Sequence, residues 1–380
     1  MNVPELEDLG DLNGKSVFLR ADLNVPLTYK DDGTAEVGDP FRIVSTFPTL
    51  EFLLNGGARV TMASHLGRPK GQVVAKYSME PVRRYIQERY QGVEVAENLR
   101  FDPREEANDD TFVRELISGH DLYVNDAFGA SHRAHASIVG PPKYLPSAAG
   151  RLLAKEANVL GHLLSEPKRP FVAIIGGAKV SDKLALIESM LPKVDALLIG
   201  GAMSYTFLAA LGHEVGDSLF EADKVETCKR LLAASDKIHL PVDSVALDSN
   251  GSFGRGATGG QVIAVGRDIP SGFRGLDVGV ETVENYSSII ASAGTILWNG
   301  PMGVFEDERF SNGTFSVGRA VAASQGFSVI GGGDSAAAIE EAGLADQVSH
   351  LSTGGGASLE LLEKGDLPGL AALRESAARP

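Results

Sequence analysis

The sequence is short of cysteine, of positive charge and of long apolar runs, and each shortage excludes a class of protein. Its 380 residues include one cysteine, Cys228, which rules out an intramolecular disulfide and fits a reducing compartment. No apolar run approaches the roughly 18 residues of a membrane span. The amino end also lacks the basic start and the apolar core of a signal peptide. We therefore expect a cytoplasmic protein without a membrane partner.

The acidic balance of the chain argues against a further group of partners. Lysine and arginine total 35 against 50 aspartates and glutamates, so the net charge is −15 at pH 7. Nucleic acids usually require a basic surface, so we expect no nucleic-acid partner. A local cluster of basic side chains can still bind a small anion.

Short apolar runs recur along the chain, with helix-like stretches between them. Several are apolar at consecutive rather than alternating positions, which is typical of strands covered by helices on both faces. The pattern predicts an α/β protein built on largely parallel sheets. The predicted strands are residues 16–19, 60–63, 122–124, 171–175, 196–199, 296–298 and 328–330.

A helical segment bracketed by prolines separates two strand-rich halves. Leucine and alanine recur at helical spacing between Pro141 and Pro170, as in an interdomain connector. A chain of 380 residues is also too long for one ordinary core. We therefore predict a first domain over residues 1–147, a hinge helix over 148–166 and a second domain over 167–366. The alternative is a surface helix within one large domain.

Four glycine-rich turns follow apolar runs in the second half of the chain. A turn from strand to helix offers backbone N–H groups and a positive helix end to a phosphate. Lys179 and Lys183 can reach phosphate oxygens, and Asp334 is an oxygen ligand suited to phosphate-bound Mg²⁺. One such turn could simply pack a helix on a sheet, but four predict a site for a nucleotide with its metal. The turns are residues 176–183, 199–203, 329–338 and 352–358.

Basic residues of the first half follow the predicted strand ends rather than lying scattered over helix faces. Ligands of open parallel sheets bind at the carboxyl ends of the strands. Arginine suits an anion there because its planar fork donates two parallel hydrogen bonds and stays charged. Each of these residues alone fits a structural ion pair equally well, but together they predict a small-anion site. They are Arg20, Arg42, His65, Arg68, Arg100 and Arg133.

These segments, in this order, resemble motifs of phosphoglycerate kinases along nearly the whole chain. The resemblance implies two Rossmann-like, parallel-sheet, three-layer (αβα) domains joined by a hinge helix. It also implies 3-phosphoglycerate on the amino-terminal domain, Mg²⁺ with ADP or ATP on the other, and a tail over 367–380 that packs back on the first domain. The motifs are residues 20–26 (RADLNVP), 64–69 (SHLGRP), 97–101 (ENLRF), 176–183 (GGAKVSDK), 298–306 (WNGPMGVFE) and 352–360 (STGGGASLE).

The resemblance further implies roles for individual residues. Arg42 would turn toward the transferring group, Lys179 would follow the moving phosphoryl, and Lys183 would contact the nucleotide phosphates. Glu306 would bind the ribose hydroxyls and Asp334 the Mg²⁺. The implied phosphoglycerate ligands are Asp22, Asn24, Arg42, His65, Arg68, Arg100 and Arg133. The implied nucleotide ligands are Gly176, Gly177, Lys179, Lys183, Gly200, Gly279, Asn299, Glu306, Gly332, Gly333, Asp334 and Ser335, with Gly354 and Gly355 at a helix end facing the transition state.

The implied activity is reversible phosphoryl transfer between 1,3-bisphosphoglycerate and ADP, giving 3-phosphoglycerate and ATP in glycolysis and gluconeogenesis. The attacking oxygens are already ionised, so the reaction needs alignment and charge compensation rather than a general base. One departure from the family pattern is Val280, which replaces the proline that commonly follows Gly279. We expect a monomer with small-molecule partners. The alternatives are a binding protein without turnover and a periplasmic-type two-domain binding protein, which leaves the nucleotide turns unexplained.

Overall fold

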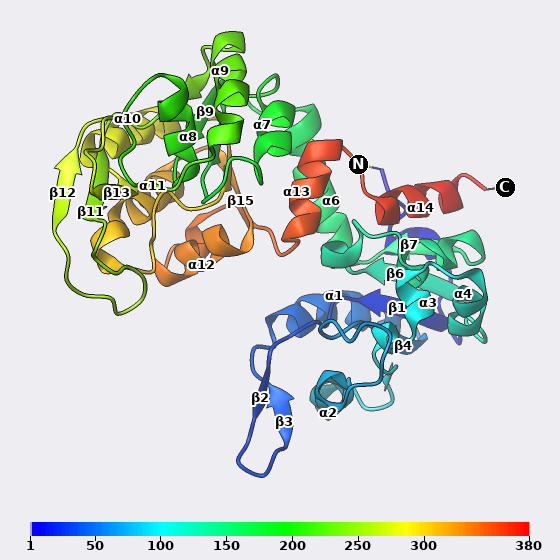
Figure 1. Ribbon diagram of the computed structural model, residues 1–380. Helices are drawn as coiled ribbons and strands as arrows, with labels where there is room; N and C mark the ends of the chain where they lie inside the picture. Colours follow the sequence, from blue (N-terminus) through cyan, green and yellow to red (C-terminus); the bar gives the residue numbers. More distant parts are fainter. Residues whose placement is uncertain (1, 380) are drawn as a thin grey trace. The chain divides into compact units, whose positions relative to one another are not determined.

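The computed structural model describes residues 2–379, which fall into two compact units (Figure 1). The first unit contains the chain up to Gly161 and the segment from Gly356 onward, and the second is His162–Gly355. Each unit is built on its own parallel sheet. The predicted α/β class with two parallel sheets is therefore confirmed. Within the described residues, no helix is long and apolar enough to cross a lipid bilayer.

The sheet of the first unit has the strand order β5-β4-β1-β6-β7, and all its neighbouring strands are parallel. Val17 and Leu19 of β1 are buried in a core shared with α1 and α2, whereas Phe18 stacks on Tyr123. Burial of successive residues explains the continuous apolar runs of the sequence. The strands are β1 Ser16–Ala21, β4 Arg59–Ala63, β5 Glu94–Val95, β6 Leu122–Asp126 and β7 Ser147–Ala149.

Helices of the first unit connect these strands or pack on them. The α-helices are α1 Phe41–Asn55, α2 Glu80–Arg89, α3 Pro103–Glu106, α4 Asp110–Leu116, α5 Ala136–Val139, α13 Gly356–Lys364 and α14 Pro368–Ala377, with α6 Arg151–Ser165 shared between the units.

The helix predicted over residues 148–166 forms as α6, but it begins at Arg151. Residues 148 and 149 belong to β7, where they pair with β6 at the edge of the sheet. Asp126 at the end of β6 then accepts hydrogen bonds from the N–H groups of Leu152 and Leu153, at 2.9 and 3.2 Å, and so caps α6. The two compact units divide inside this helix. Its role as a hinge stays a prediction.

The carboxyl-terminal helix α14 belongs to the first unit and lies beside β7 (Figure 1). Leu370 and Leu373 of this helix are fully buried. The N–H of Gly369 donates a hydrogen bond to the Ser131 carbonyl at 2.9 Å. Helix α13 also belongs to the first unit, so the second unit ends at Gly355 rather than at residue 366.

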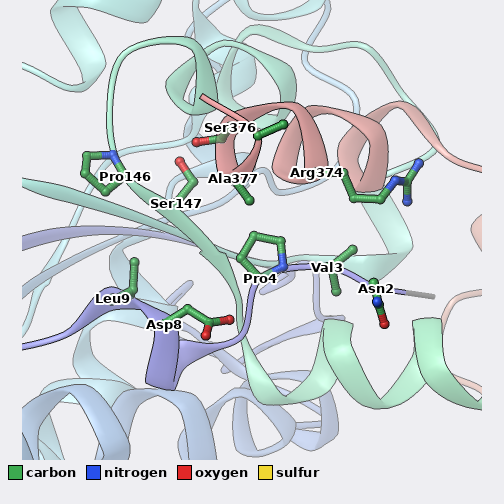
Figure 2. A pocket seen from close by; sticks show the side chains of 11 residues that line it. Asn2, Val3, Pro4, Asp8, Leu9, Pro146, Ser147, Arg374, Ser376 and Ala377 are labelled. Carbon is green, nitrogen blue, oxygen red and sulfur yellow. The ribbon is translucent and has the colours of Figure 1, made fainter. Parts of the chain in front are cut away.

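A hollow of about 770 Å³ lies where α14 meets the amino-terminal segment. Figure 2 shows Arg374 and Ser376 of α14 on one side of it, with Pro4 and Asp8 across from them. Arg374 forms an ion pair with Asp366. None of the predicted site residues lines this hollow, so it reflects the packing of the tail rather than the predicted anion site.

The sheet of the second unit has the order β10-β9-β8-β14-β15-β16, and its neighbouring strands are parallel. The four strands predicted in this half all form, as β8, β9, β14 and β15. The strands are β8 Phe171–Ile175, β9 Ala196–Ile199, β10 Ile238–His239, β14 Thr295–Asn299, β15 Phe327–Gly331 and β16 His350–Leu351. The α-helices are α7 Leu184–Met190, α8 Met203–Ala210, α9 Val225–Ala234, α10 Val280–Ala291, α11 Asn312–Ala323 and α12 Gly333–Glu341.

The structure contains two antiparallel sheets that the sequence pattern did not predict. The second unit has a sheet of β12-β11-β13, and the first has the hairpin β2-β3. The strands β2 and β3 are three residues long and lack a continuous apolar run. The strand β12 is apolar at all four positions but partly exposed, and it was not among the predicted strands. They are β2 Leu27–Tyr29, β3 Ala35–Val37, β11 Ser244–Asp248, β12 Val262–Val265 and β13 Phe273–Val278.

Candidate active site

All residues predicted to form the anion site lie in the first unit, and most follow the carboxyl end of a strand. Asp22 and Asn24 follow β1, and His65 and Arg68 follow β4. Because neighbouring parallel strands end at the same edge of a sheet, these loops are neighbours. Arg42 lies in the first turn of α1, Arg100 in the short helix η3 (Leu99–Phe101) and Arg133 just after η4 (Phe128–Ala130).

Four arginines lie within electrostatic range of the His65 imidazole. Burial lowers the pKa of His65 well below its usual range, and four guanidinium charges lower it further. In decreasing order of effect, these charges belong to Arg20, Arg100, Arg133 and Arg42. The imidazole is therefore neutral at physiological pH, and positive charge gathers around it.

Arg100 is a buried cation that is only partly compensated. Its side chain is 4% exposed and forms an ion pair with Glu106, whose Oε1 lies 3.4 Å from Nε. Burial lowers the pKa of Arg100 to about 10, and the charge of Arg133 acts in the same direction. Cations that repel one another in a buried place favour the binding of an anion between them.

Gly67 links two of the predicted ligands. Its N–H donates to Asn24 Oδ1 at 2.8 Å, and its carbonyl accepts from the Arg100 guanidinium at 3.1 Å. The backbone has φ +63°, and a Cβ there would lie 2.3 Å from the Tyr77 ring. Only glycine fits this turn, which presents the exposed Arg68 as the next residue.

Asp22 orients Arg42. The Asp22 carboxylate is buried and accepts a hydrogen bond from the Arg42 guanidinium at 3.1 Å. The Arg42 side chain remains 41% exposed. Because a guanidinium has five N–H donors, this pair leaves further donors of Arg42 for a ligand.

Three of the predicted glycine-rich turns, together with the turn at Gly300, lie at the carboxyl ends of four adjacent strands. Gly176 follows β8, Gly200 follows β9, Gly300 follows β14 and Gly332 follows β15. The loops are tightly packed, since a Cβ on Gly176 would lie 2.1 Å from the carbonyl oxygen of Pro301. Backbone N–H groups are thus concentrated at one edge of this sheet.

A hollow of about 270 Å³ opens beside these turns. Glycine backbone and small apolar side chains form most of its wall, with the carboxylates of Glu306 and Asp334. Asp334 is exposed in the first turn of α12, where backbone N–H groups lack partners within the helix. The lining residues are Gly177, Ala178, Gly201, Ala202, Gly275, Leu276, Pro301, Gly303, Val304, Glu306 and Asp334.

Hydrogen bonds between strand ends position several of the predicted nucleotide ligands. Lys183 Nζ donates to Asn299 Oδ1 at 2.5 Å, and Asn299 Nδ2 donates to the Gly331 carbonyl at 2.7 Å. Ser335 Oγ accepts from the Gly300 N–H at 2.5 Å. The amide of Asn299 therefore connects the lysine to the start of the turn that carries Gly332.

Lys179 is exposed on a loop that is hydrogen-bonded to Glu221. The Glu221 carboxylate accepts from the N–H and the hydroxyl of Ser181, at 2.9 and 2.6 Å. Burial raises the pKa of Glu221, but the hydrogen bonds from Ser181 and Val180 outweigh this effect and the pKa is lowered overall. These hydrogen bonds attach the loop at Ser181, two residues beyond the exposed Lys179.

Of the predicted glycines, Gly177 lines the hollow, whereas Gly176, Gly200, Gly332 and Gly333 lie in the turns but not among its lining residues. Gly279, Gly354 and Gly355 lie outside the lining as well. Gly279 precedes α10, and a Cβ there would lie 2.1 Å from the Asp243 carboxylate. Leu276, from the same strand end, lines the hollow instead. Gly354 and Gly355 lie at the end of the second unit, just before α13. Their roles toward a ligand stay predictions.

Comparison with known proteins decides the family. A family model described as phosphoglycerate kinase matches residues 6–97 and 89–365. The chain belongs to the phosphoglycerate kinase family. The phosphoglycerate kinase of Salinispora tropica is 48% identical over an alignment of 405 positions, which covers 98% of this chain and 100% of the relative. That of Moorella thermoacetica is 49% identical over 398 aligned positions, which cover 97% of this chain and 98% of the relative.

Solved structures of phosphoglycerate kinases have the same fold. The enzyme from Coxiella burnetii is 35% identical, with a TM-score of 0.91 and coverage of 98% of this chain and 99% of that chain. The enzyme from Pyrococcus horikoshii OT3 is 32% identical, with a TM-score of 0.81 and the same coverage. The chain is therefore an enzyme of glycolysis with phosphoglycerate kinase activity.

Sequence reasoning missed some residues around the two sites. Arg20 was grouped with the basic residues but given no role, although it is buried beside His65. A charged residue inside an apolar strand is the signal that could have marked it. Leu276 and Val304 line the hollow, but such apolar residues give no signal, because similar ones fill every core.

Proposed function

We propose that the first unit binds 3-phosphoglycerate at the predicted anion site, which we call the arginine site. The observation that carries this proposal is that burial and neighbouring guanidinium charges lower the pKa of both His65 and Arg100. A ligand with a carboxylate and a phosphate would neutralise these charges and engage several arginine forks. The proposed ligands are Asp22, Asn24, Arg42, His65, Arg68, Arg100 and Arg133, with Asp22 acting through Arg42.

The second unit binds ADP or ATP at the glycine-lined hollow. Turn amides of Gly332 and Gly333, with Lys183, would contact the phosphates, and Glu306 would take the ribose hydroxyls. Mg²⁺ fits here, because it is usually held by one or two carboxylates together with substrate phosphates. Asp334 is exposed, lines the hollow and is available for this purpose. When bound, the ion would neutralise charge on the phosphates.

Residues of this chain then assist a transfer that needs no general base. A β-phosphate oxygen of ADP forms a bond to the acyl phosphorus of 1,3-bisphosphoglycerate while the bond to the carboxylate oxygen breaks. Arg42 and Lys179 would stabilise the charge spread over the oxygens of the moving group, and helix-start amides of residues 354 and 355 would contribute to the same end. The reverse reaction uses the same groups.

The two substrates must meet for this reaction, so α6 is proposed as a hinge. Closure would exclude water from the acyl phosphate. Small-angle scattering is expected to give a smaller radius of gyration with both substrates than with either alone. An unchanged radius would count against the hinge.

A coupled assay with two variants tests the assigned roles. Arg42→Ala and Lys179→Ala should each lower kcat by about 10²-fold or more, because each removes charge from the transition state. Matched controls are Arg59→Ala, at the opposite end of β4, and Lys229→Ala, on the exposed surface of α9. Near-normal kcat in either test variant would refute that residue's role. Circular dichroism checks that all four fold.

The protein is further proposed to act in the cytoplasm as a monomer. The single cysteine supports the location, because it fits a reducing compartment. Light scattering at micromolar concentration should give the mass of one 40.0 kDa chain, and a mass of two chains would overturn the monomer.

A further inference from the structure

A buried hydrogen-bonded chain lies behind the arginine site and ends at His65. Glu105 of α3 and Arg20 of β1 are both 0% exposed, and both bind Ser137 of α5. The Glu105 carboxylate accepts from the hydroxyl and the N–H of Ser137, at 2.6 and 2.9 Å. Ser137 Oγ accepts from Arg20 Nε–H at 2.9 Å. Another nitrogen of Arg20 lies 3.2 Å from His65 Nδ1.

The chemistry of these groups sets the direction of every hydrogen bond in the chain. A carboxylate only accepts and a guanidinium only donates. The one hydroxyl proton of Ser137 therefore points to Glu105, which leaves its lone pairs for Arg20. Because Arg20 can only donate, His65 Nδ1 must be an acceptor. The neutral ring then carries its proton on Nε2.

Neighbouring groups keep this chain in place. The Tyr123 hydroxyl donates to the Ser137 carbonyl at 2.7 Å, which fixes the serine backbone. His135 Nδ1 lies 3.9 Å from Glu105, but burial, followed by the charges of nearby arginines, lowers the pKa of His135 to about 4. This imidazole is neutral at physiological pH, so the negative charge of Glu105 offsets the buried charge of Arg20.

We propose that Glu105 and Ser137 are positioning residues that act through Arg20 to hold His65 as the neutral Nε2–H tautomer. In that form His65 donates a hydrogen bond to an anionic oxygen of the bound phosphoglycerate. This inference rests on the proposed function, since it takes His65 as a substrate ligand. Glu105 and Ser137 themselves touch no substrate.

The decisive experiment measures the tautomer and the substrate affinity separately. Nitrogen-15 NMR of His65 in the ligand-free protein reports which ring nitrogen carries the proton. Steady-state kinetics give KM for 3-phosphoglycerate and KM for ATP. The variants are Ser137→Ala, which removes the link, Glu105→Gln, which places an amide donor against it, and Ser137→Thr, which restores a hydroxyl. The control is Ser16→Ala, because Ser16 contacts His120 at 3.0 Å at the opposite end of β1.

In Ser137→Ala and Glu105→Gln we expect a mixture of His65 tautomers and a KM for 3-phosphoglycerate raised about 10-fold, the effect of one lost hydrogen bond. KM for ATP should change less than about twofold. Ser137→Thr and Ser16→Ala should resemble the unmodified enzyme.

Other outcomes would overturn the inference. If His65 keeps its tautomer in Ser137→Ala, the proposed link does not exist. If both KM values rise equally, the network is structural only. Should Glu105→Gln fail to fold, Ser137→Ala decides. His65→Ala separates the two proposals, because an unchanged KM for 3-phosphoglycerate there would remove His65 from the substrate site while the tautomer measurement still stands.

Discussion

At the scale of single residues, burial decides which role a charged side chain of the first unit can take. Arg20 and Arg68 both come from motifs at strand ends, yet Arg20 is fully buried and Arg68 is exposed. Arg20 donates to Ser137 and His65 and therefore supports the site from behind. Arg68, presented by the Gly67 turn, is accessible to a ligand.

Replacing Gly67 by alanine should damage both stability and substrate binding. The added Cβ would adopt φ +63° and clash with the Tyr77 ring at 2.3 Å, which we expect to cost about 2 to 4 kcal/mol of unfolding free energy. KM for 3-phosphoglycerate should also rise, because Gly67 holds Asn24 and Arg100. Urea unfolding and the coupled assay measure the two effects.

Gly14→Ala is the matched control for this change. Gly14 has φ +70° with nothing within 4 Å of the added Cβ, so it reports the backbone strain alone, about 1 kcal/mol. Equal losses of stability in the two variants would show that the contact with Tyr77 is unimportant.

At the scale of elements, a buried carboxylate at the end of β6 sets where α6 begins. Asp126 is 0% exposed and caps this helix through Leu152 and Leu153. A Cβ on Gly150 would lie 2.3 Å from the Asp126 carboxylate, so the turn into the helix requires glycine. Strand, cap and helix start thus form one local unit.

This cap should make stability depend on pH. Burial raises the pKa of Asp126 to about 7 from 3.8, partly offset by a hydrogen bond from Thr49. Between these two values the unfolded chain has lost the proton that the folded chain keeps. The contribution of Asp126 to the unfolding free energy therefore falls as pH rises from about 4 to about 7 and levels off above. The lowered pKa values of His65 and His135 act in the opposite direction.

In Asp126→Asn, the change in unfolding free energy between pH 5 and pH 8 should be smaller by roughly 1 to 3 kcal/mol. Asparagine does not titrate, and its Oδ1 can still accept hydrogen bonds from the N–H groups of α6. Chemical unfolding at the two pH values is the measurement. The unfolding free energy of this variant should still depend on pH, because burial also raises the pKa of Asp277 to about 7. An unchanged slope would contradict the role given to Asp126.

At the scale of the whole molecule, the chain builds its first compact unit from both of its ends. Leu367, Leu370 and Leu373 bury their side chains in a unit that otherwise ends at Gly161. The last residues of the first unit therefore follow the whole second unit in the sequence.

A chain that ends at Asp366 should accordingly lose roughly 2 kcal/mol for each of these buried leucines. We expect a lower midpoint of thermal unfolding for the first unit, with an unchanged Kd for ADP at the second. Removing only residues 376–380 is the control, because it leaves the leucines in place. Equal midpoints for both truncations would show that α14 contributes no core.

The sequence by itself determined the parallel strands and the chemistry of the loops after them. A strand such as β8, Phe171–Ile175, is apolar at every position, and glycines or basic residues follow directly, so adjacent residues carry the whole signal. Tertiary structure alone decided that Glu105 and Ser137 meet Arg20 and that β11 to β13 form a separate sheet. The return of the tail to the first unit was implied by the family resemblance, but which leucines of α14 it buries was not. Those features depend on burial and hydrogen bonds between residues far apart in the chain, which no local pattern encodes.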